Sequence, residues 1–130
     1  MLMTKRYFTL QEANAALEVI RPLVEEIQTI RKAVLARSPD VWPALERSAG
    51  NGGSRTLSQL AQEFEHLDQL VHAILDAGVE IKDLSVGLLD FPAWRADHAV
   101  YLCWKHGEHE IEFWHEIEDG FAGRKPVGTF

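Results

Sequence analysis

The only cysteine and three of the six histidines follow one another in a pattern whose residue types suit a metal, C-x2-H-x2-H-x5-H. Its members are Cys103, His106, His109 and His115. Zinc prefers thiolate and imidazole ligands, but a strand places Cys103 on the face opposite His106 and His109. The two turn histidines could instead hold an ion with a neighbouring glutamate. We therefore predict no cofactor and keep zinc at His106 and His109 as the weaker alternative to a solvated polar turn.

A second set of residues supplies the groups of a small-molecule site, namely carboxylates, an imidazole, a guanidinium and two indole rings. The set consists of Asp90, Glu108, His115, Glu116, Arg124, Trp104 and Trp114. In an enzyme, His115 would be the general acid or base, held by Asp90, and Arg124 would bind an anionic substrate bidentately. The alternative is an ion pair of Arg124 with Asp90 or Glu116 that fixes the C-terminal segment to a sheet.

A β-hairpin is expected to position both sets, with Gly107 and Glu108 as a two-residue turn. This turn pairs Trp104 with Ile111 and Val100 with His115, and it places His115 on an apolar face. The other residues of that face are Val100, Leu102, Trp104, Ile111 and Phe113. A buried imidazole without a partner costs about 1–3 kcal/mol, so we expect Asp90 or Arg124 beside His115. The ring is then either a satisfied core histidine or a base at the rim of a pocket.

Two long helices are expected before the sheet. Thr9 and Glu12 form a capping box, and apolar residues at alternating steps of three and four then predict a helix to about residue 37. Pro22 lies inside this helix and predicts a bend. The same heptad spacing predicts a second helix over residues 55–77, packed antiparallel to the first as in a coiled coil. Residues 38–54 are the connection, with one short turn around residues 42–47.

The rest of the chain predicts an antiparallel meander of three to four strands. We expect a short strand over residues 79–82 and a more strongly indicated strand over residues 87–91 that ends before Pro92. Residues 92–97 are then the loop into the hairpin. The fold class is therefore α+β in a single domain of residues 1–130. The helical hairpin occupies residues 9–77, and the meander and tail occupy residues 79–126. The apolar excess on the helices favours a homodimer.

Bulk properties exclude several classes of function. The net charge of −7 disfavours nucleic acid and an anionic membrane surface as partners. One cysteine fits a reducing compartment. No apolar run approaches the about 20 residues that span a bilayer, and the opening residues do not resemble a signal peptide. We therefore expect a cytoplasmic protein. The sequence contains no phosphate-binding loop, dinucleotide fingerprint or nucleophile elbow.

Three segments together resemble a known bacterial family. They are YFTLQEANAAL at residues 7–17, GVEIKDLSVGLLDFPA at residues 78–93 and VYLCWKHGEHEIEFWHEIEDGFAGRKP at residues 100–126. In this order they are similar to the family catalogued as domain of unknown function 2203, which implies no established activity. The matching positions include Asp90, Trp104, Gly107, Glu108, Trp114, His115 and Arg124. His106 and His109 match no part of the pattern, which weakens a metal role for them.

The sequence leaves three functions open. The first is a non-catalytic, homo-oligomeric binding or assembly module, favoured by the apolar helices and by the missing catalytic motifs. The second is a small-molecule-binding domain or an enzyme that uses Asp90, His115 and Arg124 on an anionic ligand. The third is a metal-binding protein with its ion at the hairpin turn.

Overall fold

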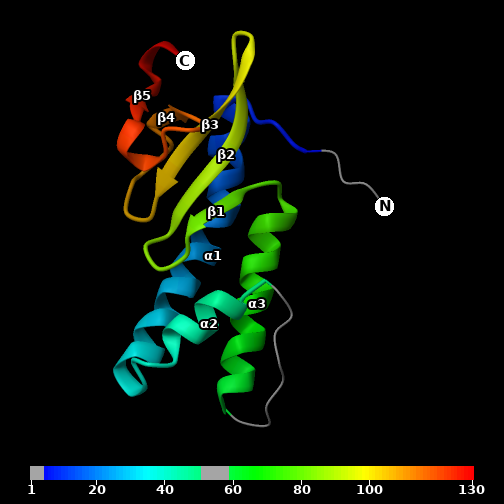
Figure 1. Ribbon diagram of the computed structural model, residues 1–130. Coiled ribbons are helices and arrows are strands. Elements are labelled where there is room, and N and C mark those ends of the chain that lie inside the picture. The colour runs from blue at the N-terminus through cyan, green and yellow to red at the C-terminus, as the bar shows by residue number, and fades with distance from the viewer. Residues whose placement is uncertain (1–4, 51–58) are drawn as a thin grey trace.

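The computed structural model describes residues 5–50 and 59–130, and its fold is α+β (Figure 1). The helices are α1 (Leu10–Arg37), α2 (Trp42–Ser48) and α3 (Gln59–Asp76). The strands are β1 (Glu80–Asp83), β2 (Leu88–Arg95), β3 (His98–Lys105), β4 (Phe113–Glu116) and β5 (Lys125–Pro126). Short 3-10 helices occupy Phe121–Gly123 and Val127–Thr129. No helix of the described ranges is long and apolar enough to cross a membrane.

Helix α1 begins as the sequence predicts. The Thr9 hydroxyl accepts the backbone N–H of Glu12 at 3.0 Å, and the Glu12 carboxylate accepts the N–H of Thr9 at 2.9 Å. The helix continues through Pro22. A proline removes one hydrogen bond of the helix. The packing of Ile20 and Val24 offsets this loss, since each of these side chains is only 2% exposed. The bend at Pro22 stays a prediction.

Helices α1 and α3 lie side by side and run in opposite directions (Figure 1). Arg37 near the end of α1 pairs with Glu63 near the start of α3. Glu26 lies further back along α1 and His66 lies further along α3, and the Glu26 carboxylate is 3.0 Å from His66 Nε2. The predicted turn around residues 42–47 is helix α2. The predicted start of the second helix, residues 55–58, lies outside the described residues.

The sheet has five antiparallel strands in the order β1-β2-β3-β4-β5, more than the three to four predicted. The predicted loop over residues 92–97 is wrong, because β2 continues through Pro92 to Arg95. Pro92 is tolerated because the pairing of β1 with β2 ends at Glu80 and Asp90. The Pro92 carbonyl accepts the N–H of Phe8 at 2.7 Å. The missing N–H of the proline therefore lies on the side that β1 has already left.

The predicted register of the central hairpin is wrong by one residue. The structure pairs Tyr101 with His115 and Leu102 with Trp114, so residues 106–112 form a loop rather than part of a two-residue hairpin. The backbone N–H of Ile111 is bound by Asn14 Oδ1 of α1 at 2.8 Å. This contact removes Ile111 from the strand ladder. The one-residue shift moves His115 to the other face of the sheet.

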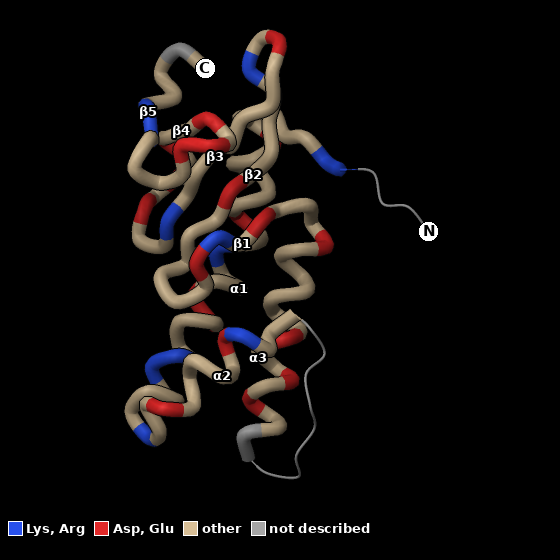
Figure 2. Tube along the Cα trace, in the orientation of Figure 1, with Lys and Arg blue, Asp and Glu red and all other residues tan. Residues whose placement is uncertain are grey.

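The two faces of the sheet have different roles. One face belongs to the hydrophobic core shared with the helices, and it carries Leu89, Phe91, Val100, Leu102 and Trp104, each at most 1% exposed. The opposite face carries Asp90, Cys103 and His115. Figure 2 shows acidic and basic positions interspersed along the helices and strands. The polar side chains that could bind or react therefore lie on the face of the sheet that does not pack against the helices.

Candidate functional site

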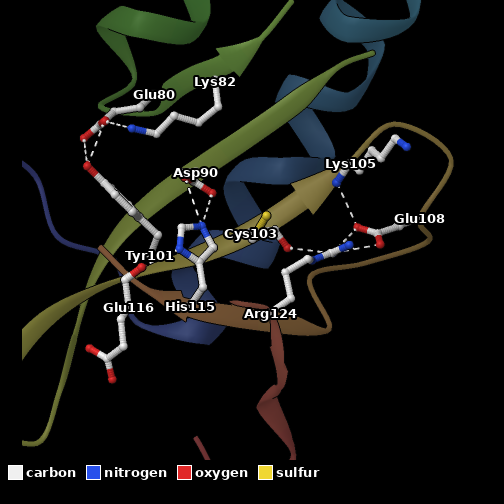
Figure 3. A network of polar contacts seen from close by, with 10 residues as sticks. All are labelled: Glu80, Lys82, Asp90, Tyr101, Cys103, Lys105, Glu108, His115, Glu116 and Arg124. Carbon is white, nitrogen blue, oxygen red and sulfur yellow. Dashed lines mark hydrogen bonds and ion pairs between the residues drawn. The ribbon is translucent and has the colours of Figure 1, made fainter. Parts of the chain in front are cut away.

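Three neighbouring strands each bring one polar side chain to the same place. Asp90 lies on β2, Cys103 on β3 and His115 on β4, and Figure 3 shows the three side chains converging. Asp90 and Cys103 are direct cross-strand partners, and His115 is diagonal to Cys103 because it pairs with Tyr101. One ligand atom from each side chain lies within 4.8 Å of the other two, and all three residues are buried. We call this group the Asp–Cys–His cluster.

The hydrogen bonds of His115 fix its tautomer. Nδ1 lies 2.7 Å from the backbone carbonyl oxygen of Glu116. A carbonyl can only accept, so Nδ1 carries a proton. Nε2 lies 3.1 Å from each carboxylate oxygen of Asp90. Two lone pairs would repel each other at this distance, so one further proton lies between His115 and Asp90. Burial raises the pKa of the Asp90 carboxyl above its ordinary value, although His115 opposes the shift.

Cys103 belongs to the cluster as a protonated thiol. Burial, together with the nearby Asp90 carboxylate, raises the pKa of the Cys103 thiol to about 12. A thiol with such a pKa is not a nucleophile at neutral pH. The set of residues predicted from the sequence for a small-molecule site did not include Cys103. The turn at Ala96 and Asp97 pairs Arg95 with His98 and therefore Asp90 with Cys103, but Ala-Asp is not a dipeptide that marks such a turn in a sequence.

A cavity of about 270 Å³ opens over Asp90 and His115. The rest of its lining comes from β1 to β3 and from the segment after β4, namely Lys82, Leu88, Tyr101, Ile117, Glu118, Asp119, Gly120 and Phe121. Ile117 and Phe121 are each 44% exposed. Three of the lining residues are carboxylic acids and one is a lysine. The cavity thus combines a polar floor with partly apolar walls.

Two residues that line the cavity, Lys82 and Tyr101, form a network with Glu80 (Figure 3). The Tyr101 hydroxyl donates to the Glu80 carboxylate at 2.9 Å, and Lys82 Nζ donates to the same group at 2.8 Å. Burial alone would raise the pKa of Glu80, but the bonds from Lys82 and Tyr101 bring it below its ordinary value. Burial and Glu80 raise the pKa of Tyr101. Glu80 is therefore an ionised acceptor and Tyr101 a protonated donor.

Arg124 lies beside the cluster but binds elsewhere. Its guanidinium donates to both carboxylate oxygens of Glu108, at 2.7 and 2.8 Å, rather than to Asp90 or Glu116. It also lies over the Phe113 and Phe121 rings, 4.1 and 4.6 Å from their centroids. These contacts hold the 3-10 helix Phe121–Gly123 against the loop that follows β3.

The other predicted residues lie away from the cavity. Trp104 is completely buried on the core face, and its indole N–H donates to the Glu108 carbonyl at 2.9 Å. Trp114 lies between Arg95 and Lys125. Glu116 contacts His98 Nε2 at 3.0 Å and points away from His115 (Figure 3).

The two histidines of the predicted turn site do not face each other. His106 Nε2 contacts Glu25 of α1 at 2.9 Å, and the His109 carbonyl accepts a bond from Arg21. Within the described ranges, neither belongs to a group of three side chains that could hold a metal ion. The geometry that suits an ion is at the Asp–Cys–His cluster instead.

The chain thus has an α+β fold with a buried polar cluster beneath a small cavity. The model of the family of uncharacterized conserved proteins DUF2203 matches residues 6–127. The chain belongs to this family, as its motifs indicate, and the family description names no activity. No curated protein and no solved structure matches the chain.

Proposed function

We propose that this chain is a binding domain that takes a small polar ligand into the cavity above Asp90 and His115. The proposal depends on one observation, the burial of this pair at the floor of a cavity. The two residues are only 2% and 1% exposed. A buried ion pair contributes little net stability compared with apolar residues of the same volume. A role in binding explains why this position of the sheet holds polar side chains.

The size and charge of the cavity favour particular ligands. Its volume of about 270 Å³ is slightly below the usual range for ligand pockets, which suits a small metabolite. Glu118 and Asp119 supply more negative charge than Lys82 supplies positive charge, which favours a ligand with positive charge or several hydrogen-bond donors. The anionic ligand predicted from Arg124 stays a prediction, and the pairing of Arg124 with Glu108 does not favour it.

A ligand screen by thermal shift tests the proposal, with metal-free protein and small metabolites grouped by charge. A ligand that binds only the native state raises the midpoint of unfolding. We expect a shift with the wild type that becomes smaller in Ile117→Ser, which removes an apolar wall of the cavity. Val86→Ser is the matched control, because Val86 is 42% exposed and Ile117 is 44% exposed. No shift with any group of ligands, or equal losses in both variants, would contradict the proposal.

Self-association is the second candidate, favoured by an apolar groove between α1 and α3. The groove has a volume of about 490 Å³ and is lined mainly by alanine and aliphatic residues, including Val19. Val19 is 70% exposed. Arg6 and Glu12 also line the groove, and opposite charges on one patch suit a twofold contact with a second copy of this chain.

Light scattering over a range of concentrations tests self-association. We expect the wild type to form a dimer and Val19→Lys to remain a monomer, because a lysine in an apolar interface is left without a partner. Val86→Lys introduces the same charge at another exposed valine and should leave the dimer intact. A monomeric wild type at all concentrations would eliminate this candidate.

A further inference from the structure

The Asp–Cys–His cluster combines three different ligand types within one coordination distance of each other. A carboxylate, a thiol and an imidazole lie with their ligand atoms within 4.8 Å of one another. Two ligands of one tetrahedral zinc ion lie roughly 3–4 Å apart, given bond lengths of about 2.0–2.3 Å. Only small side-chain movements are therefore needed to bring Asp90, Cys103 and His115 onto one ion.

The orientation of His115 is the one that metal-binding histidines adopt. Its Nδ1 donates to a backbone carbonyl at 2.7 Å, which is the common outer-shell contact of such residues. This bond directs Nε2 toward Asp90. The ring is therefore held in the tautomer and direction that coordination by Nε2 requires.

Charge balance also favours an ion at this position. As ligands, the Cys103 thiolate and the Asp90 carboxylate carry two negative charges, and the His115 imidazole is neutral. A divalent ion bound by these three groups leaves the buried cluster without a net charge. The large cost of burying a net charge is thereby avoided.

We infer that Asp90, Cys103 and His115 coordinate a single transition-metal ion of the zinc type through a carboxylate oxygen, Sγ and Nε2. A thiolate ligand disfavours magnesium and calcium, which prefer oxygen ligands. Three protein ligands leave a fourth tetrahedral position for water or a ligand, as at catalytic zinc sites. The cavity over Asp90 and His115 gives access to it. This inference rests on the proposed function, since it names what the floor of the cavity binds.

Titration of the metal-free full-length protein with cobalt(II) tests the inference, since cobalt(II) replaces zinc and absorbs light. We expect a sulfur-to-cobalt charge-transfer band and intense visible bands of tetrahedral cobalt that saturate at one ion per chain. Zinc added afterwards should abolish them. Cys103→Ser should lose the charge-transfer band while it keeps its fold, because the hydroxyl replaces the thiol without a cavity. Asp90→Asn and His115→Ala should weaken binding by more than the roughly 10–100-fold that loss of an outer-shell partner costs.

His106→Ala and His109→Ala are the matched controls, because each removes an imidazole outside the cluster. Both should bind cobalt as the wild type does. A wild type that shows no charge-transfer band and retains no zinc overturns the inference. Binding that is lost in His106→Ala but kept in His115→Ala also overturns it, since the ion would then lie at the turn. The titration contains no organic ligand, so its failure leaves the separate screen on metal-free protein to decide the proposed binding function.

Discussion

One guanidinium nitrogen of Arg124 lies 2.7 and 2.8 Å from the two carboxylate oxygens of Glu108. The two side chains are 11% and 22% exposed. The same carboxylate accepts the backbone N–H of Lys105 at 2.8 Å. Glu108 therefore joins the end of β3 and the following loop to Arg124, which directly follows the 3-10 helix Phe121–Gly123. It is not a member of the Asp–Cys–His cluster.

Glu108→Gln should destabilise the protein by about 2 kcal/mol, because a neutral amide leaves the Arg124 guanidinium with weaker bonds in a partly buried place. Arg124→Leu should cost a similar amount. Urea denaturation of both variants and of the double variant measures the coupling. We expect the double variant to cost less than the sum of the two single variants. Additive effects would show that the pair contributes no coupling energy.

Gly87 is required by both its backbone and its surroundings. Its φ is +70°, and a Cβ built on it would lie 2.7 Å from the Cβ of His106 and 3.0 Å from Val24. Gly87→Ala should therefore cost about 2–4 kcal/mol, from backbone strain and overpacking together. Gly128→Ala is the control, since a Cβ there meets nothing within 4 Å. Thermal unfolding of the two variants makes the comparison, and equal midpoints would refute the predicted clash.

Ser85 connects helix α2 to the loop after β1. Its hydroxyl accepts the Trp42 indole N–H at 3.0 Å and donates to Glu46 at 2.7 Å. Ser85→Ala should cost about 1–2 kcal/mol, because the N–H of the buried indole loses its partner. Trp42→Phe removes that donor together with part of the packing. In Trp42→Phe, adding Ser85→Ala should have a smaller effect in urea denaturation than in the wild type. An undiminished effect would assign the loss to Glu46 alone.

Local signals in the sequence predicted local structure correctly. The capping box of Thr9 and Glu12 has both its hydrogen bonds because all of its atoms belong to one helical turn. The expected pairing of His115 with Asp90 is also present. The face of the sheet on which His115 lies was predicted wrongly, because the hairpin register depends on contacts between distant segments. Asn14 of α1, which binds Ile111, lies 97 residues earlier in the chain.

Two further differences also arise from distant contacts. Pro92 was expected to end a strand, but its effect depends on where the neighbouring strand β1 stops. Arg124 was expected near Asp90, but Glu108 offers it a carboxylate and Phe113 and Phe121 offer it aromatic rings. Cys103 was considered only with the turn histidines, and its place beside Asp90 was missed because the strand of Asp90 was predicted too short. The residue types of the site were therefore predictable, whereas their arrangement depended on the register.

His98 provides a test by pH at the start of β3. Its Nδ1 lies 3.1 Å from Asp97 and its Nε2 lies 3.0 Å from Glu116. The hydrogen bond with Asp97, followed by the smaller effect of Glu116, raises the pKa of His98 above its ordinary value of 6.5. Protonated His98 therefore stabilises the native state. This contribution is fully present below the unfolded pKa of about 6.5 and disappears as the pH rises through the native pKa.

An NMR titration of the imidazole ring should give a pKa for His98 above 6.5 in the wild type and a lower one in Asp97→Asn, which keeps the shape but removes the charge. The wild type should be more stable than Asp97→Asn in acid below the unfolded pKa. The difference should vanish in alkaline solution, where His98 is neutral in both proteins. A difference in stability that persists unchanged at high pH would mean that Asp97 acts through the turn at Ala96 and not through the charge of His98.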